Sequence, residues 1–400
     1  MIMRLLLAIC FCLGFAQPGI GQISDDAVRI GVLTDMNGIF AAASGPGSVL
    51  AAQMAAEDFG GKVRGKPIEI ISADHQNKPD VGTAIIRKWF DTESVDAVTD
   101  LPLSSIALAA QEIARQKKKT LLISGGATSD LYGKACSPYS TLWSDDTYTL
   151  AATTAKAILD NGGKEWFFVT VDYALGHALE RDATSIINAN GGKVLGAVRH
   201  PLGQPDLASF LLQAQSSKSK VIGLANVGSD TSNTLKQAKE FGISQGGQGV
   251  VAFLYFLTDV HAVGLDVAQG LYLLDGFYWD QNKEARDWAI RFQARHKGAM
   301  PTKEHAATYS AVMHYLKAVD LSGTDASEQA NAAMRTLEVN HFGHKGSIRV
   351  DGRVLFDETL YQVKSPAESK ASWDYLKRVR VISRDVAFRP LEQGGCPLAN

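Results

Sequence analysis

The sequence predicts an α/β protein of two doubly wound lobes, each built on a parallel central sheet, joined by a hinge that the chain crosses several times. Short apolar runs typical of buried strands alternate with amphipathic segments typical of helices. This alternation indicates parallel sheets with helices on both faces. The chain has 400 residues, and because a single core stops growing at about 250 to 300 residues, two lobes are expected.

The N-terminal residues have the layout of a secretory signal peptide, which we assign to residues 1–22. Arg4 supplies a positive charge, Leu5 to Phe15 form an unbroken apolar run, and the chain then becomes small and polar. The run is shorter than the roughly 20 residues that span a bilayer, and Ile9 is not the small residue that precedes a lipoprotein cysteine. A buried N-terminal helix is the alternative. We expect a soluble protein exported to the periplasm.

The expected strands and helices fall into two groups. Strands of the first lobe are expected at residues 28–34, 68–72, 95–99 and 120–124, and those of the second at 166–171, 193–198, 220–225 and 250–253. Helices between them are expected at residues 79–90, 105–115, 148–160, 176–190, 206–215 and 230–241.

The C-terminal third is more helical. Long helices are expected at residues 282–296, 302–321 and 326–337, and we expect them to complete the first lobe. Residues 346–350 and 355–363, joined across an Asp-Gly turn, are expected to form a hairpin-like crossing back to the second lobe. The predicted boundaries are therefore 26–143 plus 276–349 for the first lobe, and 144–275 plus 350–400 for the second.

Composition excludes some classes of partner and leaves two cysteines to explain. Lys and Arg number 40 against 42 Asp and Glu, so no basic surface for nucleic acid is expected. Removal of the signal leaves Cys136 and Cys396. In an oxidising compartment a disulfide between them is expected, with two free thiols as the alternative. His341 and His344 lack flanking ligands, so no metal and no cofactor are expected.

Four loops follow predicted strands and are rich in glycine and small polar residues: 35–47, 102–105, 124–128 and 172–176. Ligands of parallel sheets bind at the carboxyl ends of strands, where helix N-termini present unpaired N–H groups. The hydroxyls of Ser104, Ser105 and Thr128 add donors for a carboxylate. Each loop by itself also fits an ordinary helix cap, but their succession favours a ligand site.

The order of several motifs resembles the periplasmic solute-binding proteins of ABC importers, in the leucine/isoleucine/valine-binding family. The motifs are IGVLTDMNG, LPLSS, LLISGGATSDL, TVDYALG and GHKGSIRVDGRVLFDETLYQVK. The resemblance covers essentially the whole mature chain. It implies the type I periplasmic-binding-protein fold and a monomer that captures a small solute between its lobes and presents it to the ABC permease.

The resemblance also implies positions for the ligand contacts. Ser104 or Ser105, Gly126 and Thr128 are expected to hold the ligand carboxylate on the first lobe. Tyr173 and the loop around Asn226 are expected to close over the ligand from the second lobe.

Two departures from the family pattern bear on the ligand. The family's amino acid binders place a Glu after the strand that corresponds to residues 250–253, where this chain has Phe253 or Tyr255. In the first loop Ser44 and its neighbour replace an aromatic residue, although Phe40 lies close by. An unpaired ammonium in a closed cleft is costly, so these departures favour an aromatic or short organic acid.

Amino acids remain open as ligands because two acids, Asp230 and Asp146, are candidate partners for an ammonium group. The chain has no G-x-S-x-G nucleophile motif, and the run at Gly45 lacks the third glycine of the dinucleotide fingerprint. We therefore expect a binding protein and no enzyme. The alternatives are a periplasmic ligand-sensing protein for a receptor and, less favoured, an exported α/β enzyme.

Overall fold

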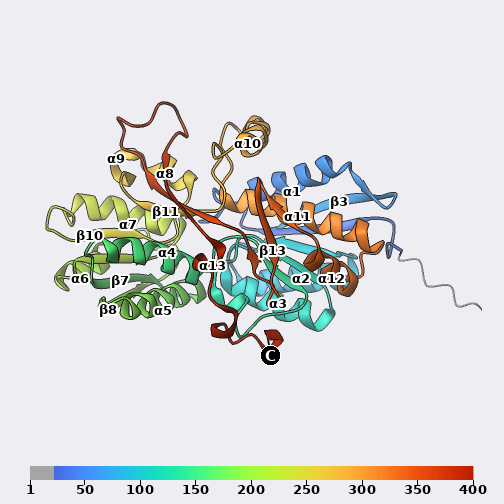
Figure 1. Cartoon of the computed structure of the whole chain (residues 1–400), viewed down its shortest axis with the longest axis horizontal. Coiled ribbons are helices and arrows are strands. Elements are labelled where there is room, and N and C mark those ends of the chain that lie inside the picture. The colour runs from blue at the N-terminus through green and yellow to red at the C-terminus, as the bar shows by residue number, and fades with distance from the viewer. Residues whose placement is uncertain (1–21, 400) are drawn as a thin grey trace, which may run out of the picture.

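The computed structural model describes residues 22–399, and Figure 1 shows two lobes side by side with crossing segments between them. The predicted signal peptide lies outside these residues apart from Gln22. Within residues 22–399, no helix is both long enough and apolar enough to cross a membrane.

The first lobe contains a six-stranded sheet of order β2-β3-β1-β4-β5-β6. Its parallel centre is β1, which pairs with β3 and β4, and the four predicted strands are confirmed. The short strands β2 and β6 were not predicted because two or three residues show no period. The strands are β1 (Val28–Thr34), β2 (Lys62–Val63), β3 (Lys66–Asp74), β4 (Ala97–Asp100), β5 (Thr120–Ile123) and β6 (Ser140–Leu142).

Helices cover both faces of this sheet, as Figure 1 shows around the labels α1, α2 and α3. Helices α2 and α3 contact each other, and α1 contacts α11. Buried alanines such as Ala52 and Ala311 share one core with Tyr315, so α11 and α12 complete the first lobe as predicted. The helices are α1 (Gly45–Phe59), α2 (Pro79–Thr92), α3 (Ser104–Lys117), α11 (Lys303–Ser322) and α12 (Ser327–Thr336).

The second lobe contains a parallel sheet of order β10-β9-β7-β8, and its four predicted strands are confirmed. The strands are β7 (Glu165–Val171), β8 (Lys193–His200), β9 (Val221–Ala225) and β10 (Gly249–Ala252). The helices are α4 (Thr147–Asp160), α5 (Ala174–Ala189), α6 (Ala208–Ser216), α7 (Gly228–Glu240), α8 (Leu257–Val263) and α9 (Leu265–Ala268).

The C-terminal crossing differs from the expected hairpin. Strand β13 (His344–Ile348) pairs with β12 (Val339–His341) and with the two-residue β14 (Val354–Leu355). The run expected at 355–363 breaks because Phe356 is buried in the first-lobe core. Its second part, β15 (Glu358–Val363), lies between β11 (Tyr272–Asp275) and β16 (Leu376–Ile382) in a separate antiparallel sheet.

Two further helices and a disulfide complete the fold of the described residues, and α10 (Lys283–Arg295) contacts α1 of the first lobe. Helix α10 precedes α11, and α13 (Arg384–Ala387) follows β16. The predicted disulfide is confirmed, because Cys136 and Cys396 are bonded with their Cα atoms 5.6 Å apart. The disulfide attaches the tail, which the predicted boundaries assign to the second lobe, to a loop of the first lobe. The lobe boundaries themselves stay a prediction.

Candidate ligand-binding cleft

The first rim of the cleft is the loop after β1, and the carboxylate of Asp35 shapes it. Asp35 accepts hydrogen bonds from the N–H groups of Gly38 (2.7 Å) and Phe40 (3.0 Å) and from the Asn77 amide (2.7 Å). The far end of the loop is held by α11, since the His305 ring donates to the carbonyl oxygen of Ser44 at 2.8 Å. The side chain of Phe40 is buried beneath this rim.

The second rim brings together the residues predicted to hold a carboxylate. Ser104, the first residue of α3, accepts a hydrogen bond from the N–H of Ala127 at 3.3 Å. A Cβ at Gly126 would lie 3.0 Å from the Leu101 carbonyl oxygen, so glycine permits the close approach of the two loops. Thr128 is fully buried and caps the short helix that follows. Ser105 is half-buried beside them.

The second lobe contributes buried polar atoms at the N-termini of α5 and α7. Within residues 22–399 the hydroxyls of Tyr173 and Thr231 have no hydrogen-bond partner, and neither has Oδ1 of Asp230. The other oxygen of Asp230 accepts from the N–H of Gly203 at 2.9 Å. Burial raises the pKa of Asp230. Such atoms are costly to bury unless something bonds them.

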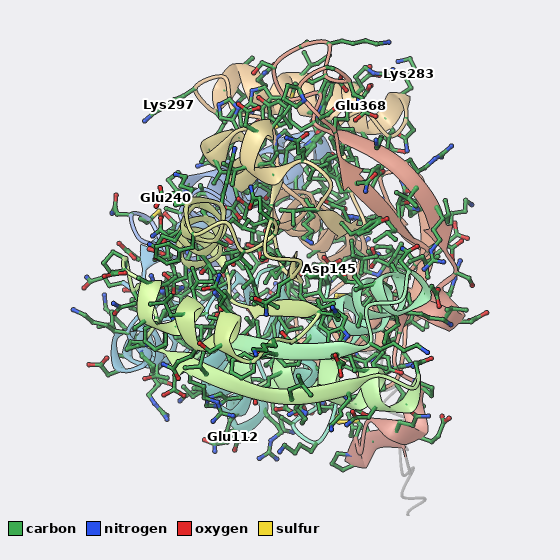
Figure 2. All side chains as sticks on the ribbon, turned by 90° about the vertical axis from the view of Figure 1, so that its left-hand side faces the viewer. Glu112, Asp145, Glu240, Lys283, Lys297 and Glu368 are labelled. Atoms are coloured by element: carbon green, nitrogen blue, oxygen red, sulfur yellow. A yellow bond between two sulfur atoms is a disulfide. The ribbon has the colours of Figure 1, made fainter. Side chains whose placement is uncertain are left out.

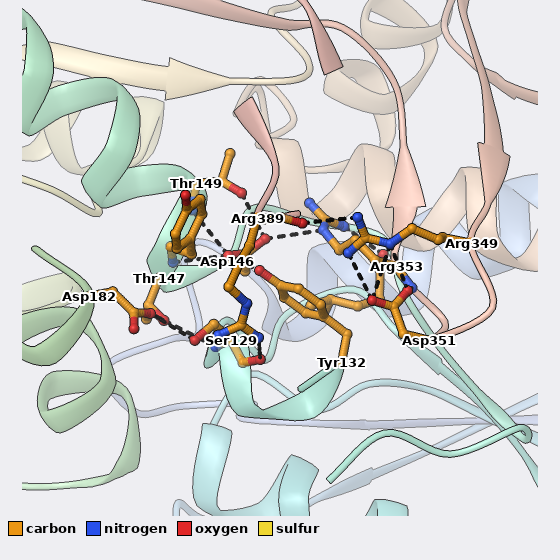
Figure 3. Close-up of polar contacts among 12 residues, drawn as sticks. Ser129, Tyr132, Asp146, Thr147, Thr149, Asp182, Arg349, Asp351, Arg353 and Arg389 are labelled. Atoms are coloured by element: carbon orange, nitrogen blue, oxygen red, sulfur yellow. Dashed lines mark hydrogen bonds and ion pairs between the residues drawn. The ribbon is translucent and has the colours of Figure 1, made fainter. Parts of the chain in front are cut away.

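The two lobes touch across these rims. Gly228 at the start of α7 has a φ of +56°, and a Cβ there would lie 2.7 Å from the carbonyl oxygen of Ile39. Deeper in the interface, Asp182 of α5 accepts a hydrogen bond from the hydroxyl of Ser129, a first-lobe residue, at 2.7 Å (Figure 3). The structure is therefore a closed arrangement of the lobes.

Acidic groups dominate the electrostatics of the closed cleft. Ser44 lies between Asp100 (3.1 Å) and Glu304 (2.5 Å). Burial raises the pKa of Asp100 to about 7 and that of Glu304 well above its usual range. Burial also raises the pKa of Tyr173, and the charges of Asp230 and Glu304 raise it further.

Three of the predicted contacts have side chains that are engaged with partners in the second lobe. The ring of Phe253 packs with those of Trp166 and Phe168, with centroids 6.0 and 6.1 Å away. The Tyr255 hydroxyl lies 3.3 Å from the Ser232 hydroxyl and donates to a backbone carbonyl. The amide of Asn226 bonds the side chains of His200 and Thr234 within the same lobe.

Asp146, one of the two candidate ammonium partners, is already fully engaged (Figure 3). Its carboxylate accepts from Arg353 Nε (3.1 Å), the Tyr132 hydroxyl (2.8 Å) and the Thr149 hydroxyl (2.8 Å), and it caps α4. Both ion-pair partners are completely buried. Asp146 is therefore a structural residue of the hinge.

Sequence reasoning missed Asp100, Thr231 and Glu304. Asp100 ends an apolar run and was readable as a strand-end acid, whereas Glu304 lies inside an amphipathic helix and carries no local signal. Across residues 22–399, no cluster of three His, Cys, Asp or Glu residues is placed to hold a metal ion. His341 instead bonds the Ser310 hydroxyl at 2.9 Å.

Two doubly wound lobes closed over a polar cleft define the class of bilobal solute-binding proteins. The profile of the family described as periplasmic binding protein matches residues 27–370. The chain belongs to this family.

Two solved structures and a curated relative support the assignment. A periplasmic binding protein from Burkholderia mallei is 45% identical, with a TM-score of 0.91 and coverage of 93% of this chain and 99% of that one. A branched chain amino acid ABC transporter periplasmic ligand-binding protein from Burkholderia xenovorans LB400 is 37% identical, with a TM-score of 0.83 and coverage of 93% and 100%. The Leu/Ile/Val-binding protein homolog 6 of Brucella abortus is 25% identical over a match that covers 56% of this chain and 57% of the length of that protein.

Proposed function

We propose that this protein captures a small carboxylate-bearing solute in the periplasm by lobe closure and delivers it to an ABC permease. A signal peptide at residues 1–22 would direct its export, and the exported protein would act as a monomer without catalysis. The observation that carries the proposal is a set of buried polar atoms that have no partner among residues 22–399, namely Tyr173 OH, Thr231 Oγ1 and Asp230 Oδ1, at the face of one lobe that meets the other.

The carboxylate half of the solute is proposed to bind the second rim. There the N-terminus of α3 begins without a side-chain cap, so its N–H groups are free of competition from a capping residue. The hydroxyls of Ser104, Ser105 and Thr128 lie at or beside this terminus, and Gly126 keeps the adjacent loop close. N–H groups at a helix N-terminus favour an anion.

The other half of the solute is proposed to face Asp230. Of the two candidate ammonium partners, Asp146 is already bonded to Arg353 and other donors, whereas one carboxyl oxygen of Asp230 has no partner in the described part of the chain. This favours an amino acid over an acid that lacks an amine. The closed state is then selected because only there does the solute contact both lobes.

Ligand identification is the direct test. Mass spectrometry of small molecules released from the purified mature protein, followed by a thermal-shift screen of amino acids, aromatic acids and aliphatic acids, is expected to find one amino acid that raises Tm. Turnover of a candidate ligand, with no compound that binds stably, would instead favour the exported enzyme.

Two variants test the carboxylate half and the ammonium half of the proposed site separately. Thr128→Ala should weaken binding by about tenfold with little change in folding, because one hydrogen bond to an anion is lost. Thr83→Ala on α2, whose hydroxyl bonds only its own helix, is the matched control. Asp230→Asn should weaken an amino acid and spare an acid without an amine; equal effects on both would contradict the role of Asp230.

A further inference from the structure

Two buried carboxyl groups of the first lobe share a single hydroxyl group. Ser44 Oγ lies 3.1 Å from Asp100 Oδ1 and 2.5 Å from Glu304 Oε2. Ser44 and Asp100 are completely buried, and Glu304 is 4% exposed. The three residues come from three elements, namely the loop before α1, the end of β4 and the first turn of α11.

A count of hydrogens constrains this arrangement. A serine hydroxyl has one hydrogen, so it can donate to only one of the two carboxyl groups. If both carboxyl groups were ionised, one of them would face the Ser44 oxygen with no hydrogen between the two oxygens. Two buried negative charges would also lie side by side. One of the two carboxyl groups must therefore carry a proton and donate it to Ser44.

The surroundings favour the protonated form. The charged neighbours of the pair are Asp35 in the loop after β1, and Lys303 and Asp145 near Glu304. Lys303 is engaged elsewhere, with Asp145 and the Leu274 carbonyl oxygen. His305 donates to the Ser44 backbone, and burial lowers its pKa to about 3, so it is neutral.

The backbone holds Asp100 in this position at some cost. Asp100 has a φ of 79° and Leu101 a φ of 65°, both in the left-handed region. Residues other than glycine rarely adopt this conformation, and such strain is concentrated at functional sites. The second carboxyl oxygen of Asp100 has no partner among the described residues.

We propose that Asp100, Ser44 and Glu304 hold one proton in the closed form and release it when the lobes open, so that closure is linked to proton uptake. Lys303, the residue before Glu304, lies over the ring of Phe256 of the second lobe, with its Nζ 5.5 Å from the ring centroid. Separation of the lobes would remove this cover and admit water, which restores ordinary carboxyl acidity.

The sign of the linkage follows from the raised carboxyl pKa of the closed form. The closed form keeps its proton to higher pH than the open form, so closure is fully favoured below the ordinary pKa near 4. Closure then weakens by about tenfold per pH unit as pH rises. The loss continues until the closed form itself releases the proton at about 7 or above.

Small-angle X-ray scattering of the ligand-free mature protein at about pH 5 and about pH 8 tests the linkage. The radius of gyration of the wild type should grow with pH, whereas Glu304→Gln, which needs no proton, should stay equally compact. Glu112→Gln, at an exposed position on α3, should behave as the wild type. A wild-type radius that does not change, or a Glu304→Gln variant that expands equally, would overturn the linkage.

Infrared spectroscopy at about pH 5, where the closed form is favoured and keeps its proton, tests the proton itself without need of any ligand. The carbonyl band of protonated carboxyl groups should lose intensity in both Asp100→Asn and Glu304→Gln, each checked for folding by circular dichroism. An unchanged band in both folded variants would overturn the shared proton. Neither measurement depends on the identity of the solute, so failure here would leave the proposed transport function standing.

Discussion

The cleft and the hinge both bury carboxylates, but they treat them in opposite ways. In the hinge, Asp146 is surrounded by donors and ion-paired to the buried Arg353 (Figure 3). In the cleft, Asp100, Asp230 and Tyr173 each keep a buried polar atom without a described partner. Satisfied groups stabilise the fold, whereas unsatisfied groups reduce stability and are retained for what they can bind.

The difference between the buried carboxylates of the cleft and those of the hinge is not absolute. The hinge also contains Glu358, whose two carboxyl oxygens lack described partners, beside the ion pair of Lys303 and Asp145. Figure 2 labels Asp145 in the interior, unlike the exposed Glu112 and Glu368. Burial raises the pKa of Glu358 well above its usual range and so favours its neutral form.

The largest expected effect comes from the satisfied hinge network. Arg353→Ala leaves Asp146 as a buried charge without its cation, which typically costs about 3 to 5 kcal/mol. Urea unfolding should show this loss. Arg380→Ala, at an exposed position on β16, is the control and should change the free energy of unfolding by less than about 0.5 kcal/mol. Equal losses would contradict the structural role of the hinge pair.

Reduction of the disulfide tests how firmly the tail is attached to the first lobe. The bond joins residues 260 positions apart, and loss of such a cross-link typically costs about 2 to 4 kcal/mol. Treatment of the mature protein with a reductant should lower Tm, and the Cys136→Ser, Cys396→Ser double variant should show the same loss. Thiol labelling of the untreated native protein should detect neither cysteine.

The contact between the lobes is tested at Gly228. Alanine there must adopt a left-handed φ and push against the Ile39 carbonyl oxygen, so Gly228→Ala should disfavour the closed form by about 1 to 2 kcal/mol or more. Gly242→Ala has a similar φ of +64° with no atom nearer than 3.6 Å. Scattering should show a larger radius of gyration for the first variant alone, and expansion of both would point to backbone strain.

The smallest expected effect separates a partnered hydroxyl from an unpartnered one. Thr149 donates to Asp146 at 2.8 Å, and because Asp146 keeps its other donors, Thr149→Val should cost about 0.5 to 1.5 kcal/mol in unfolding free energy. Thr231 has no described partner, so Thr231→Val should leave stability unchanged or slightly higher and weaken ligand binding. A clear loss of stability in Thr231→Val would contradict the role of Thr231 as a ligand contact in the cleft.

Local chemistry was enough to predict most of the fold. The alternation of apolar runs and amphipathic segments predicted the central strands of both parallel sheets and the return of α11 and α12. The presence of only two cysteines after removal of the signal peptide predicted the disulfide between them. The loops at Ser104 and Gly126 were predicted to meet because the carboxyl ends of parallel strands share one edge, and the Ser104 to Ala127 hydrogen bond joins them.

Other features were decided only by the tertiary structure. Asp146 and Asp230 look alike in the sequence, since each lies at the start of a helix after a strand, yet Asp146 is paired with Arg353 and Asp230 keeps one oxygen without a described partner. Ser44, Asp100 and Glu304 meet although as many as 260 positions separate them. Periodicity reports which face of an element is buried, whereas the partner and charge state of a buried polar group depend on what distant segments place beside it.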